Sequence, residues 1–277
     1  MPCLRADDPL SLLRPSAMIT SPDNPKLRYL RRLSDSKAFR AHEGRVVLEG
    51  LRLVEAALAA GALPALVLVS AELLATERGH GLRERLQTAG ATLLETSPAL
   101  FRATADTATP QGLLAAFPIP QPPPPERPSL VLVLDGWRDP GNLGTALRAA
   151  AAAGVDLALL TAGTVDPWHP RALRAGMGAQ FVLPLEAAAP EQVAARLQGL
   201  DLWIAEASGE RVHTAVDWTR PAAILVGGEA EGASGASLSL PHQTVQIAMP
   251  GAMESLNAAT AAAVLLFEAL RQRAAAG

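Results

Sequence analysis

The chain passes from an apolar run, Leu130-Val-Leu-Val-Leu134, into the polar segment Asp139-Pro-Gly-Asn-Leu-Gly-Thr-Ala-Leu-Arg148. Two more polar segments follow predicted strands: Gly227-Gly-Glu-Ala-Glu-Gly232 and Ile247-Ala-Met-Pro-Gly-Ala-Met-Glu-Ser-Leu-Asn257. Ligands bind beyond the carboxyl ends of the strands in open α/β sheets. Because three such strand ends fall in one half of the chain, we expect them to form one composite site.

The second half of the chain alternates short apolar runs with helical patterns, which predicts a parallel sheet buried on both faces. The predicted strands are residues 130–134, 157–160, 181–183, 202–205, 223–226 and 244–247. The predicted helices are residues 143–153, 171–175, 190–200 and 256–271. The last helix carries one apolar face, so we expect it to pack tightly; the face consists of Leu256, Ala259, Ala263, Leu266, Phe267 and Leu270.

A proline-rich segment, Pro118-Ile-Pro-Gln-Pro-Pro-Pro-Pro-Glu-Arg-Pro128, marks the boundary between two predicted domains. Such a run is extended and can join neither a helix nor a central strand. We therefore expect a flexible extension at 1–18, a smaller α/β domain at 19–117, a linker at 118–128 and the parallel-sheet domain at 129–277. Translation could start at Met1 or at Met18, and the pattern leaves both open.

The smaller domain also alternates strands and helices, which predicts an α/β unit. Its predicted strands are residues 45–49, 65–69, 91–95 and 112–117. Its predicted helices are residues 25–41, 51–60 and 82–89.

Composition excludes several classes of protein. The 277 residues contain one cysteine, Cys3, which excludes a disulfide framework and a cysteine-based zinc site within one chain and fits a cytoplasmic setting. No apolar run reaches the length of ~18 residues that a membrane span needs. The five histidines are scattered, and the sequence has no dinucleotide fingerprint, P-loop, zinc-protease motif or nucleophile elbow. We therefore expect no metal site and no membrane contact.

Basic residues gather in one short region although the whole chain carries a formal net charge of −3. Residues 24–45 contain seven cations and two acids, with Tyr29 and Phe39 among them. Such a cluster is typical of a solvated helix face, and equally of a surface that grips phosphates and stacks on bases. For the second interpretation the candidate RNA-binding residues are Lys26, Arg28, Arg31, Arg32 and Arg40.

Each polar segment also has a purely structural interpretation. Asn142 or Ser255 could cap a helix, Arg148 could be a solvated helix residue, and Glu229 could belong to an exposed turn. In the functional interpretation, a helix start and the Arg148 guanidinium hold a phosphate or an oxyanion. Glycines before Glu229 would let the backbone approach a ligand.

Taken together, the segments resemble the SpoU/TrmH-like RNA ribose 2′-O-methyltransferases of the SPOUT superfamily. Residues 139–148, 225–232 and 247–268 are similar to the three family motifs, and residues 166–179 to a further family stretch. The region from Asn24-Pro-Lys-Leu to Glu49-Gly-Leu-Arg52 is similar to the substrate-binding module of ribosomal-RNA members. Each motif is weak alone, but their order and spacing are highly specific.

The resemblance implies a C-terminal domain with a trefoil (α/β) knot and a smaller N-terminal α/β substrate-binding domain. Knots are nearly absent from other folds, so patterning could not predict one. The resemblance also implies S-adenosylmethionine (SAM) as methyl donor, a homodimer whose interface helps to build the site, and RNA, most of all 23S ribosomal RNA, as partner.

Family roles can be carried over position by position. The positions that match the catalytic or substrate-positioning set are Asn142, Arg148, Glu229, Ser255 and Asn257. The positions implied to bind the cofactor are Gly227, Gly228, Ile247, Met249 and Leu256. Two positions depart from the common pattern, because Gly228 stands where many members have Asn and Ala248 replaces a common Pro. We expect altered packing of the loop rather than loss of activity.

The resemblance predicts transfer of a methyl group to a ribose 2′-hydroxyl of large-subunit rRNA. Arg148 would stabilise the adjacent phosphate and the developing alkoxide, because a guanidinium does not normally lose its proton in proteins. The proton acceptor, the methylated nucleotide and its base stay open. Alternatives are a tRNA 2′-O-methyltransferase, a catalytically silent RNA-binding or ribosome-assembly factor, and a nucleotide-dependent metabolic enzyme.

Overall fold

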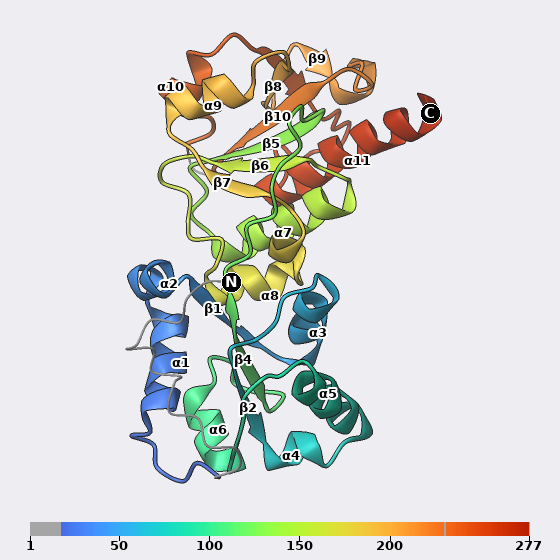
Figure 1. Cartoon of the computed structure of the whole chain (residues 1–277). Helices are drawn as coiled ribbons and strands as arrows, with labels where there is room; N and C mark the ends of the chain where they lie inside the picture. The colour runs from blue at the N-terminus through green and yellow to red at the C-terminus, as the bar shows by residue number, and fades with distance from the viewer. Residues whose placement is uncertain (1–17, 230, 277) are drawn as a thin grey trace. The chain divides into compact units, whose positions relative to one another are not determined.

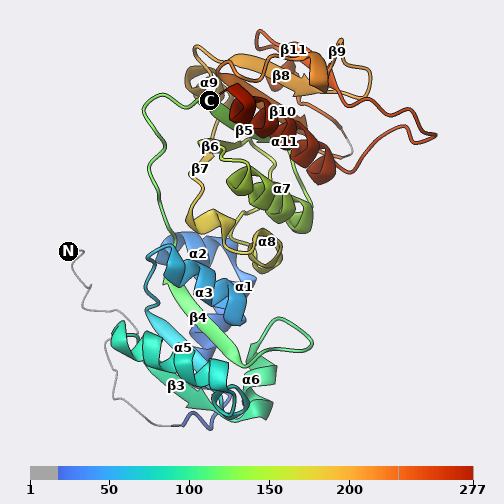
Figure 2. The same ribbon diagram turned by 90° about the vertical axis from the view of Figure 1, so that its right-hand side faces the viewer.

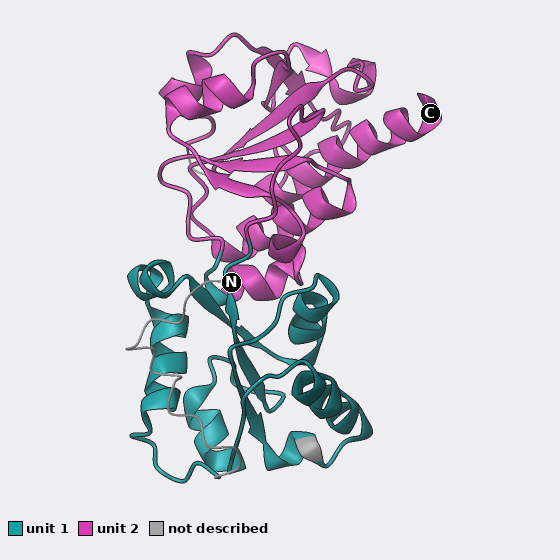
Figure 3. Cartoon of the chain, in the orientation of Figure 1, with its two compact units in different colours: residues 1–120, 168–170 teal, residues 121–167, 171–277 magenta. Residues whose placement is uncertain are grey.

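The computed structural model describes residues 18–229 and 231–276, shown in two views in Figures 1 and 2. The expected extension at 1–18 therefore lies outside the described residues, except for Met18. The chain divides into two compact units (Figure 3). Unit 1 comprises residues 1–120 and 168–170, and unit 2 comprises residues 121–167 and 171–277.

Unit 1 contains a four-stranded sheet in the order β1-β4-β2-β3. The strands are β1 (Arg45–Glu49), β2 (Leu66–Ser70), β3 (Leu93–Thr96) and β4 (Leu113–Pro118). β4 pairs antiparallel with β1 and β2, and β2 pairs parallel with β3. The helices are α1 (Pro25–Asp35), α2 (Lys37–Glu43), α3 (Leu51–Ala59), α4 (Ala71–Leu74), α5 (Glu77–Thr88) and α6 (Pro98–Thr104).

The single helix expected at 25–41 is wrong, because Ser36 separates two helices. Ser36 has an extended backbone, and its hydroxyl accepts a hydrogen bond from the amide of Phe39. Serine competes for backbone groups in this way and favours caps over helix interiors. Two further short helices, α4 and α6, were not expected; each starts after a serine whose hydroxyl caps it.

The bend after α1 also determines where Arg40 lies. Its side chain is only 3% exposed, and Nη1 donates to the carbonyl oxygens of Leu33 (2.7 Å) and Ser34 (2.9 Å). The last carbonyls of a helix have no partner within the helix, and a guanidinium satisfies them well. A buried group with these bonds is not placed to bind a phosphate, so the prediction that Arg40 contacts RNA is wrong.

Unit 2 contains a seven-stranded, fully parallel sheet in the order β7-β6-β5-β10-β8-β11-β9. Its strands are β5 (Leu130–Asp135), β6 (Leu157–Leu160), β7 (Leu185–Ala187), β8 (Asp201–Ala205), β9 (Arg211–Val212), β10 (Ala222–Gly227) and β11 (Gln243–Gln246). The predicted parallel sheet is confirmed. None of the described helices combines the length and hydropathy needed to cross a membrane.

Helices cover both faces of this sheet (Figures 1 and 2). The helices of this unit are α7 (Pro140–Ala152), α8 (Pro170–Gly176), α9 (Pro190–Arg196), α10 (Gly235–Leu238) and α11 (Ala258–Ala276), and α8 packs on α7. Alternate residues of β5 separate the two layers, because Leu130 and Leu132 pack with α7 and α11, whereas Val131 packs with α9. Burial on both faces explains the continuous apolar strands.

Some predicted bounds in unit 2 are wrong, and two of them have a clear physical reason. Residues 181–183 form no strand: Gly178 takes a left-handed conformation (φ 95°), a 3-10 turn follows (Ala179–Phe181), and the strand starts only after Pro184. The last helix starts at Ala258 rather than at 256 because Asn257 caps it. The Asn257 Oδ1 atom accepts hydrogen bonds from the amides of Ala259 (3.0 Å) and Thr260 (3.3 Å).

The apolar face expected on α11 is also partly wrong. Phe267 is 48% exposed and Leu256, which precedes the helix, is 39% exposed. The buried face consists instead of Ala258, Ala259, Ala262, Leu265, Leu266 and Ala269. Small residues on this face let α11 pack closely against α7, which presents its own buried alanines.

Arg40→Ala should weaken unit 1, because it leaves two carbonyl groups at the end of α1 without their charged donor. Loss of hydrogen bonds to a charged group costs about 1.5–3 kcal/mol. Hydrogen exchange of the α1 amides, followed by mass spectrometry, measures this loss locally. Lys37→Ala is the matched control, because Lys37 is exposed and lies on α2, the helix that carries Arg40. Equal protection of the α1 amides in the two variants would contradict the capping role of Arg40.

Candidate functional site

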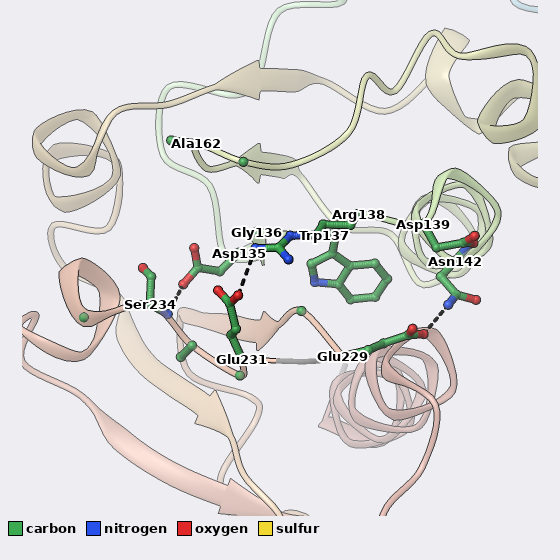
Figure 4. Close-up of a pocket in the computed structure, with 15 residues that line it drawn as sticks. Asp135, Gly136, Trp137, Arg138, Asp139, Asn142, Ala162, Glu229, Glu231 and Ser234 are labelled. Atoms are coloured by element: carbon green, nitrogen blue, oxygen red, sulfur yellow. Dashed lines mark hydrogen bonds and ion pairs between the residues drawn. The ribbon is translucent and has the colours of Figure 1, made fainter.

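The three polar segments meet at Glu229. Its Oε1 atom accepts hydrogen bonds from Nδ2 of Asn142, on α7, and from Nδ2 of Asn257 (2.9 Å), at the start of α11. Figure 4 shows the bond between Asn142 and Glu229. The segments follow β5, β10 and β11, which are parallel and therefore end at the same edge of the sheet. The structure thus places these three predicted residues together.

Both asparagines are held by their own backbone surroundings. The amide of Asn142 donates to Oδ1 of Asp139 (2.7 Å), which is the N-cap of α7. The expectation that Asn142 could itself be the cap is wrong, because α7 begins with Pro140, earlier than predicted. Asn257 caps α11 with Oδ1, which leaves Nδ2 for Glu229. A preorganised pair of amide donors therefore orients one carboxylate oxygen.

Backbone contacts shape the loop that carries Glu229. The amide of Gly228 donates to the carbonyl of Asp135 (2.8 Å), and the amide of Gly232 donates to the carbonyl of Gly228 (3.0 Å). A Cβ atom at Gly227 would lie 2.1 Å from the carbonyl carbon of Gly232. Only glycine tolerates so close a backbone approach, which is the physical reason for the first glycine of this segment.

The buried carboxylate of Asp135 fastens this loop to the sheet. Oδ2 accepts from the amide of Ser234 (2.7 Å), and Oδ1 accepts from the hydroxyl of Thr161 (2.5 Å). Burial alone would raise the pKa of Asp135. Hydrogen bonds from Thr161, Ser234 and Ser237 lower it by more than burial raises it, so the pKa lies below its ordinary value of 3.8. The carboxylate is therefore charged at neutral pH and holds β5, β6 and the loop together.

A cavity of about 500 Å³ opens between the loops after β10 and β11; we call it the β10–β11 cavity. Apolar and polar groups line it together, as in most small-molecule sites. All five predicted cofactor positions line it, namely Gly227, Gly228, Ile247, Met249 and Leu256. Ser255, Asn257 and Glu229 line it as well. Ser255 caps no helix in the structure, so its predicted capping role is wrong.

A second cavity of about 460 Å³ lies between the loops after β5 and β10; we call it the β5–β10 cavity (Figure 4). Asn142 and Glu229 belong to its lining, so the Glu229 cluster stands between the two cavities. The Trp137 side chain is buried, and its Nε1 donates to the carbonyl of Val226 (2.8 Å). This bond ties the end of β5 to the end of β10.

Arg148 is the predicted site residue that the structure does not bring into the cluster. It lies two turns after Asn142 on an exposed part of α7. Within residues 18–229 and 231–276 its side chain makes no hydrogen bond or ion pair. In that same part of the chain, no group of three or more His, Cys, Asp or Glu side chains is placed to hold a metal ion.

Gly228, which departs from the family pattern, lies against the loop after β5. A Cβ atom at this position would lie 2.8 Å from the carbonyl oxygen of Gly136. A side chain there would require one of the two loops to move. The glycine therefore permits the close contact between the two loops, and the effect of this departure on activity stays a prediction.

The remaining predicted RNA-binding residues lie on α1. Arg28 and Arg32 are exposed, and the Arg32 guanidinium stacks 3.9 Å from the centroid of the Phe39 ring. Arg31 is half-buried and donates to the carbonyl of Ala103 (3.0 Å). Lys26 is also half-buried. Arg28 and Arg32 are thus the predicted RNA-binding residues most accessible to a polyanion.

Sequence reasoning missed residues that line the two cavities. Glu206 follows β8 directly and lines the β10–β11 cavity; an acid at a strand end was the signal that could have identified it. Arg138 and Glu231 line the β5–β10 cavity and form an ion pair of 2.9 Å. Glu231 belongs to a quoted segment and Arg138 directly precedes another, but nothing in their spacing indicates that they meet.

Comparison with known proteins identifies both units. Residues 129–267 match the model of the SpoU rRNA Methylase family. Residues 24–115 match the MRM3-like substrate binding domain.

Relatives match along most of the chain. An uncharacterized tRNA/rRNA methyltransferase of Synechocystis is 37% identical over 94% of this chain and 96% of its own. The 23S rRNA (guanosine(2553)-2′-O)-methyltransferase RlmP of Bacillus subtilis is 30% identical over 90% of this chain and 97% of its own. The crystal structure of the SpoU methyltransferase AviRb from Streptomyces viridochromogenes with AdoMet superposes with a TM-score of 0.81 and 27% identity, and covers 91% of this chain and 98% of that one.

Asp135→Asn should destabilise unit 2 at neutral pH by about 1–3 kcal/mol, because an amide nitrogen would face a donor. The depressed pKa of Asp135 contributes stability that is fully present above the unfolded value and is lost as pH falls through the folded value. The wild-type free energy of unfolding should therefore fall as the pH drops towards and below the ordinary pKa of 3.8, and the variant should show a smaller fall. Urea denaturation across this range measures both.

Asp217→Asn is the matched control for this experiment. Asp217 is exposed and bonded to Thr219, and its pKa is also lowered by that hydrogen bond. Its replacement should change stability little. If Asp135→Asn were as stable as this control at pH 7, the fastening role of Asp135 would be wrong.

Proposed function

Because the chain belongs to the SpoU rRNA Methylase family, we propose that it transfers a methyl group from SAM to a ribose 2′-hydroxyl of large-subunit ribosomal RNA. It is a SAM-dependent RNA methyltransferase by family and by the names of its relatives. The observation that carries the site assignment is the convergence of Asn142, Glu229 and Asn257 between two cavities.

The β10–β11 cavity suits SAM in size and in chemistry. Ile247, Met249 and Leu256 offer apolar surface for the adenine ring, and Glu206 offers acceptors for hydroxyl groups. The backbone of Gly227 and Gly228 can approach the ligand closely because neither residue has a side chain. When bound, SAM supplies an electrophilic methyl group on a sulfonium.

The chain's own residues would position the acceptor hydroxyl. Both amide donors bond to Oε1 of Glu229, so Oε2 accepts no hydrogen bond from the described part of the chain. We assign this oxygen to the ribose 2′-hydroxyl, where it would orient the nucleophile beside the β10–β11 cavity. Ser255 would order the loop that forms the other wall.

Arg148 would act from a second copy of the chain. Its exposed place on α7, away from the Glu229 cluster, is explained if a homodimer brings Arg148 of the partner subunit to the site. There the guanidinium would stabilise the neighbouring phosphate and the developing alkoxide. The exposed Phe267 on α11 would be covered in the same interface.

We also propose that residues 129–277 contain the trefoil knot of the SPOUT superfamily. The strand order supports this, because β10 lies between β5 and β8 although it follows both in the chain. Residues 19–117 would bind the RNA substrate through Lys26, Arg28, Arg31 and Arg32, and residues 118–128 would link the two domains. The substrate and the single cysteine favour the cytoplasm.

Transfer of tritiated methyl groups from SAM to total RNA from a strain lacking the protein tests the function. We expect label in large-subunit rRNA that survives alkali as a dinucleotide, because a 2′-O-methyl group blocks cleavage. Label in tRNA would overturn the substrate. No label in any fraction, from protein that binds SAM, would favour the assembly-factor alternative.

Arg148→Lys keeps the charge but loses the fork of the guanidinium. We expect kcat to fall roughly 100-fold, since loss of one oriented charge-stabilising donor has this effect, with SAM affinity unchanged. Steady-state methyl transfer and calorimetric SAM titration measure the two quantities. Full activity of Arg148→Lys would show that the fork has no role.

Mixing two inactive variants tests the shared site. If Arg148 acts across the interface, co-refolded Arg148→Ala and Asn142→Ala chains should regain roughly a quarter of wild-type activity, because half of the dimers contain one intact site. If both residues act within one subunit, mixing should restore nothing.

Replacing Arg28 and Arg32 by Gln should weaken rRNA binding and reduce the slope of log affinity against log salt by up to about 2, because up to two phosphate contacts are lost. Filter binding at several salt concentrations measures the slope, and SAM affinity should not change. Arg83→Gln with Arg102→Gln, which removes two cations elsewhere in unit 1, is the control. An unchanged slope in the Arg28/Arg32 variant would remove these residues from the interface.

A further inference from the structure

The β5–β10 cavity has no task in the function proposed so far. It shares Asn142 and Glu229 with the site of methyl transfer but lies on the other side of Glu229 from the β10–β11 cavity. Its volume of about 460 Å³ lies within the range of small-molecule binding sites. A nucleotide whose ribose reaches Glu229 must also place its base close by, because one glycosidic bond joins the two.

The charges that line this cavity select against a phosphate. Its lining holds four carboxylates and one guanidinium, namely Asp135, Asp139, Glu229, Glu231 and Arg138. Arg171, which is outside the lining, pairs with Asp139 (3.2 Å), but the carboxylates still outnumber the guanidinium groups, and an excess of negative charge repels a phosphodiester. It attracts an uncharged group that is rich in N–H donors, and a nucleobase is such a group.

Three of these carboxylates are already committed to the protein. Asp135 binds Thr161 and Ser234, as described above, and Asp139 caps α7. Glu229 binds the two asparagines. Asp135 and Asp139 hold the loops in place, and the Oε2 atom of Glu229 is assigned to the ribose, so none of the three is left to recognise the base.

Arg138 and Glu231 are the charged lining groups that remain. Within the described part of the chain they bond only to each other, with Nη2 of Arg138 2.9 Å from Oε1 of Glu231 (Figure 4). Their side chains are 72% and 75% exposed. An exposed ion pair contributes little to stability, so the two side chains can separate at little cost and each can bind a ligand instead.

Resting on the proposed function, we propose that the β5–β10 cavity receives the nucleobase of the acceptor nucleotide and that Arg138 and Glu231 select guanine. Guanine presents adjacent N1–H and N2–H donors, which a carboxylate accepts in bidentate fashion. It also presents the adjacent acceptors O6 and N7, which a guanidinium binds with both arms. Adenine has an acceptor at N1, which would face Glu231, and uracil has a single donor between two acceptors.

The identity of the methylated nucleoside is the first test. Large-subunit rRNA from a strain lacking the protein is labelled with tritiated SAM, and the alkali-resistant dinucleotide is digested to nucleosides. The label is expected in 2′-O-methylguanosine, and label in any other nucleoside overturns the proposal. Absence of label from all RNA would contradict the proposed function instead.

The second test couples the protein to the base. Glu231→Gln and Arg138→Gln should lower kcat/KM for rRNA roughly 10- to 100-fold, the range expected for a lost bidentate base contact, with SAM affinity unchanged. Glu186→Gln is the matched control, because Glu186 pairs with Arg196 (2.8 Å) at a surface position outside the cavity lining. Activity of either cavity variant equal to that of this control overturns the proposal.

Inosine separates base reading from a merely structural effect. It lacks the N2 amino group and can be placed at the mapped nucleotide of large-subunit rRNA by splinted ligation. Wild-type protein should lose at least roughly 10-fold in kcat/KM on this RNA, whereas Glu231→Gln should lose little more than it has already lost. If the change to inosine costs both proteins the same factor, Glu231 does not read the base.

Discussion

The buried carboxylate of Asp135 is the constraint on which the site depends. It stands at the end of β5 and takes hydrogen bonds from β6 and from the loop after β10. Without this acceptor, the amide of Ser234 would lose the hydrogen bond that fastens the loop carrying Glu229 to the end of β5. The residue is charged at neutral pH because its hydrogen bonds outweigh the effect of burial on its pKa. A structural acid thus supports the site by fixing the loops around it.

Close backbone contacts support the same arrangement. Gly227 and Gly228 bring the loop after β10 against itself and against Gly136, and Trp137 ties the ends of β5 and β10 together. On α7, a Cβ atom at Gly144 would lie 2.2 Å from the carbonyl oxygen of Ala172, so this glycine lets α7 approach α8. The glycines of the polar segments therefore serve packing between loops and helices, and the functional side chains stand on the rigid frame that results.

Glu229 connects two cavities of different character. The β10–β11 cavity is shaped by apolar side chains from the last loop, whereas the β5–β10 cavity is lined by acids and one arginine. A methyl donor in the first and an acceptor nucleotide in the second would meet at one carboxylate. The cations of α1 lie in the other unit, so in the proposed function the residues that bind phosphates would be separate from those that position the reacting groups. Such a separation would explain how a chain of net charge −3 can bind RNA.

The sequence by itself determined the parallel sheet and the order of its polar strand ends, because burial on both faces imposes continuous apolar runs that can be read directly. It also determined the family. Only the tertiary structure decided the ends of the helices, since Asp139, Ser36 and Asn257 compete with neighbouring residues for the same backbone amides. Only the fold revealed that Arg40 is buried, that Arg148 stands apart from Glu229, and that Arg138 meets Glu231. These facts depend on loops from distant strands, and no local pattern records how such loops approach each other.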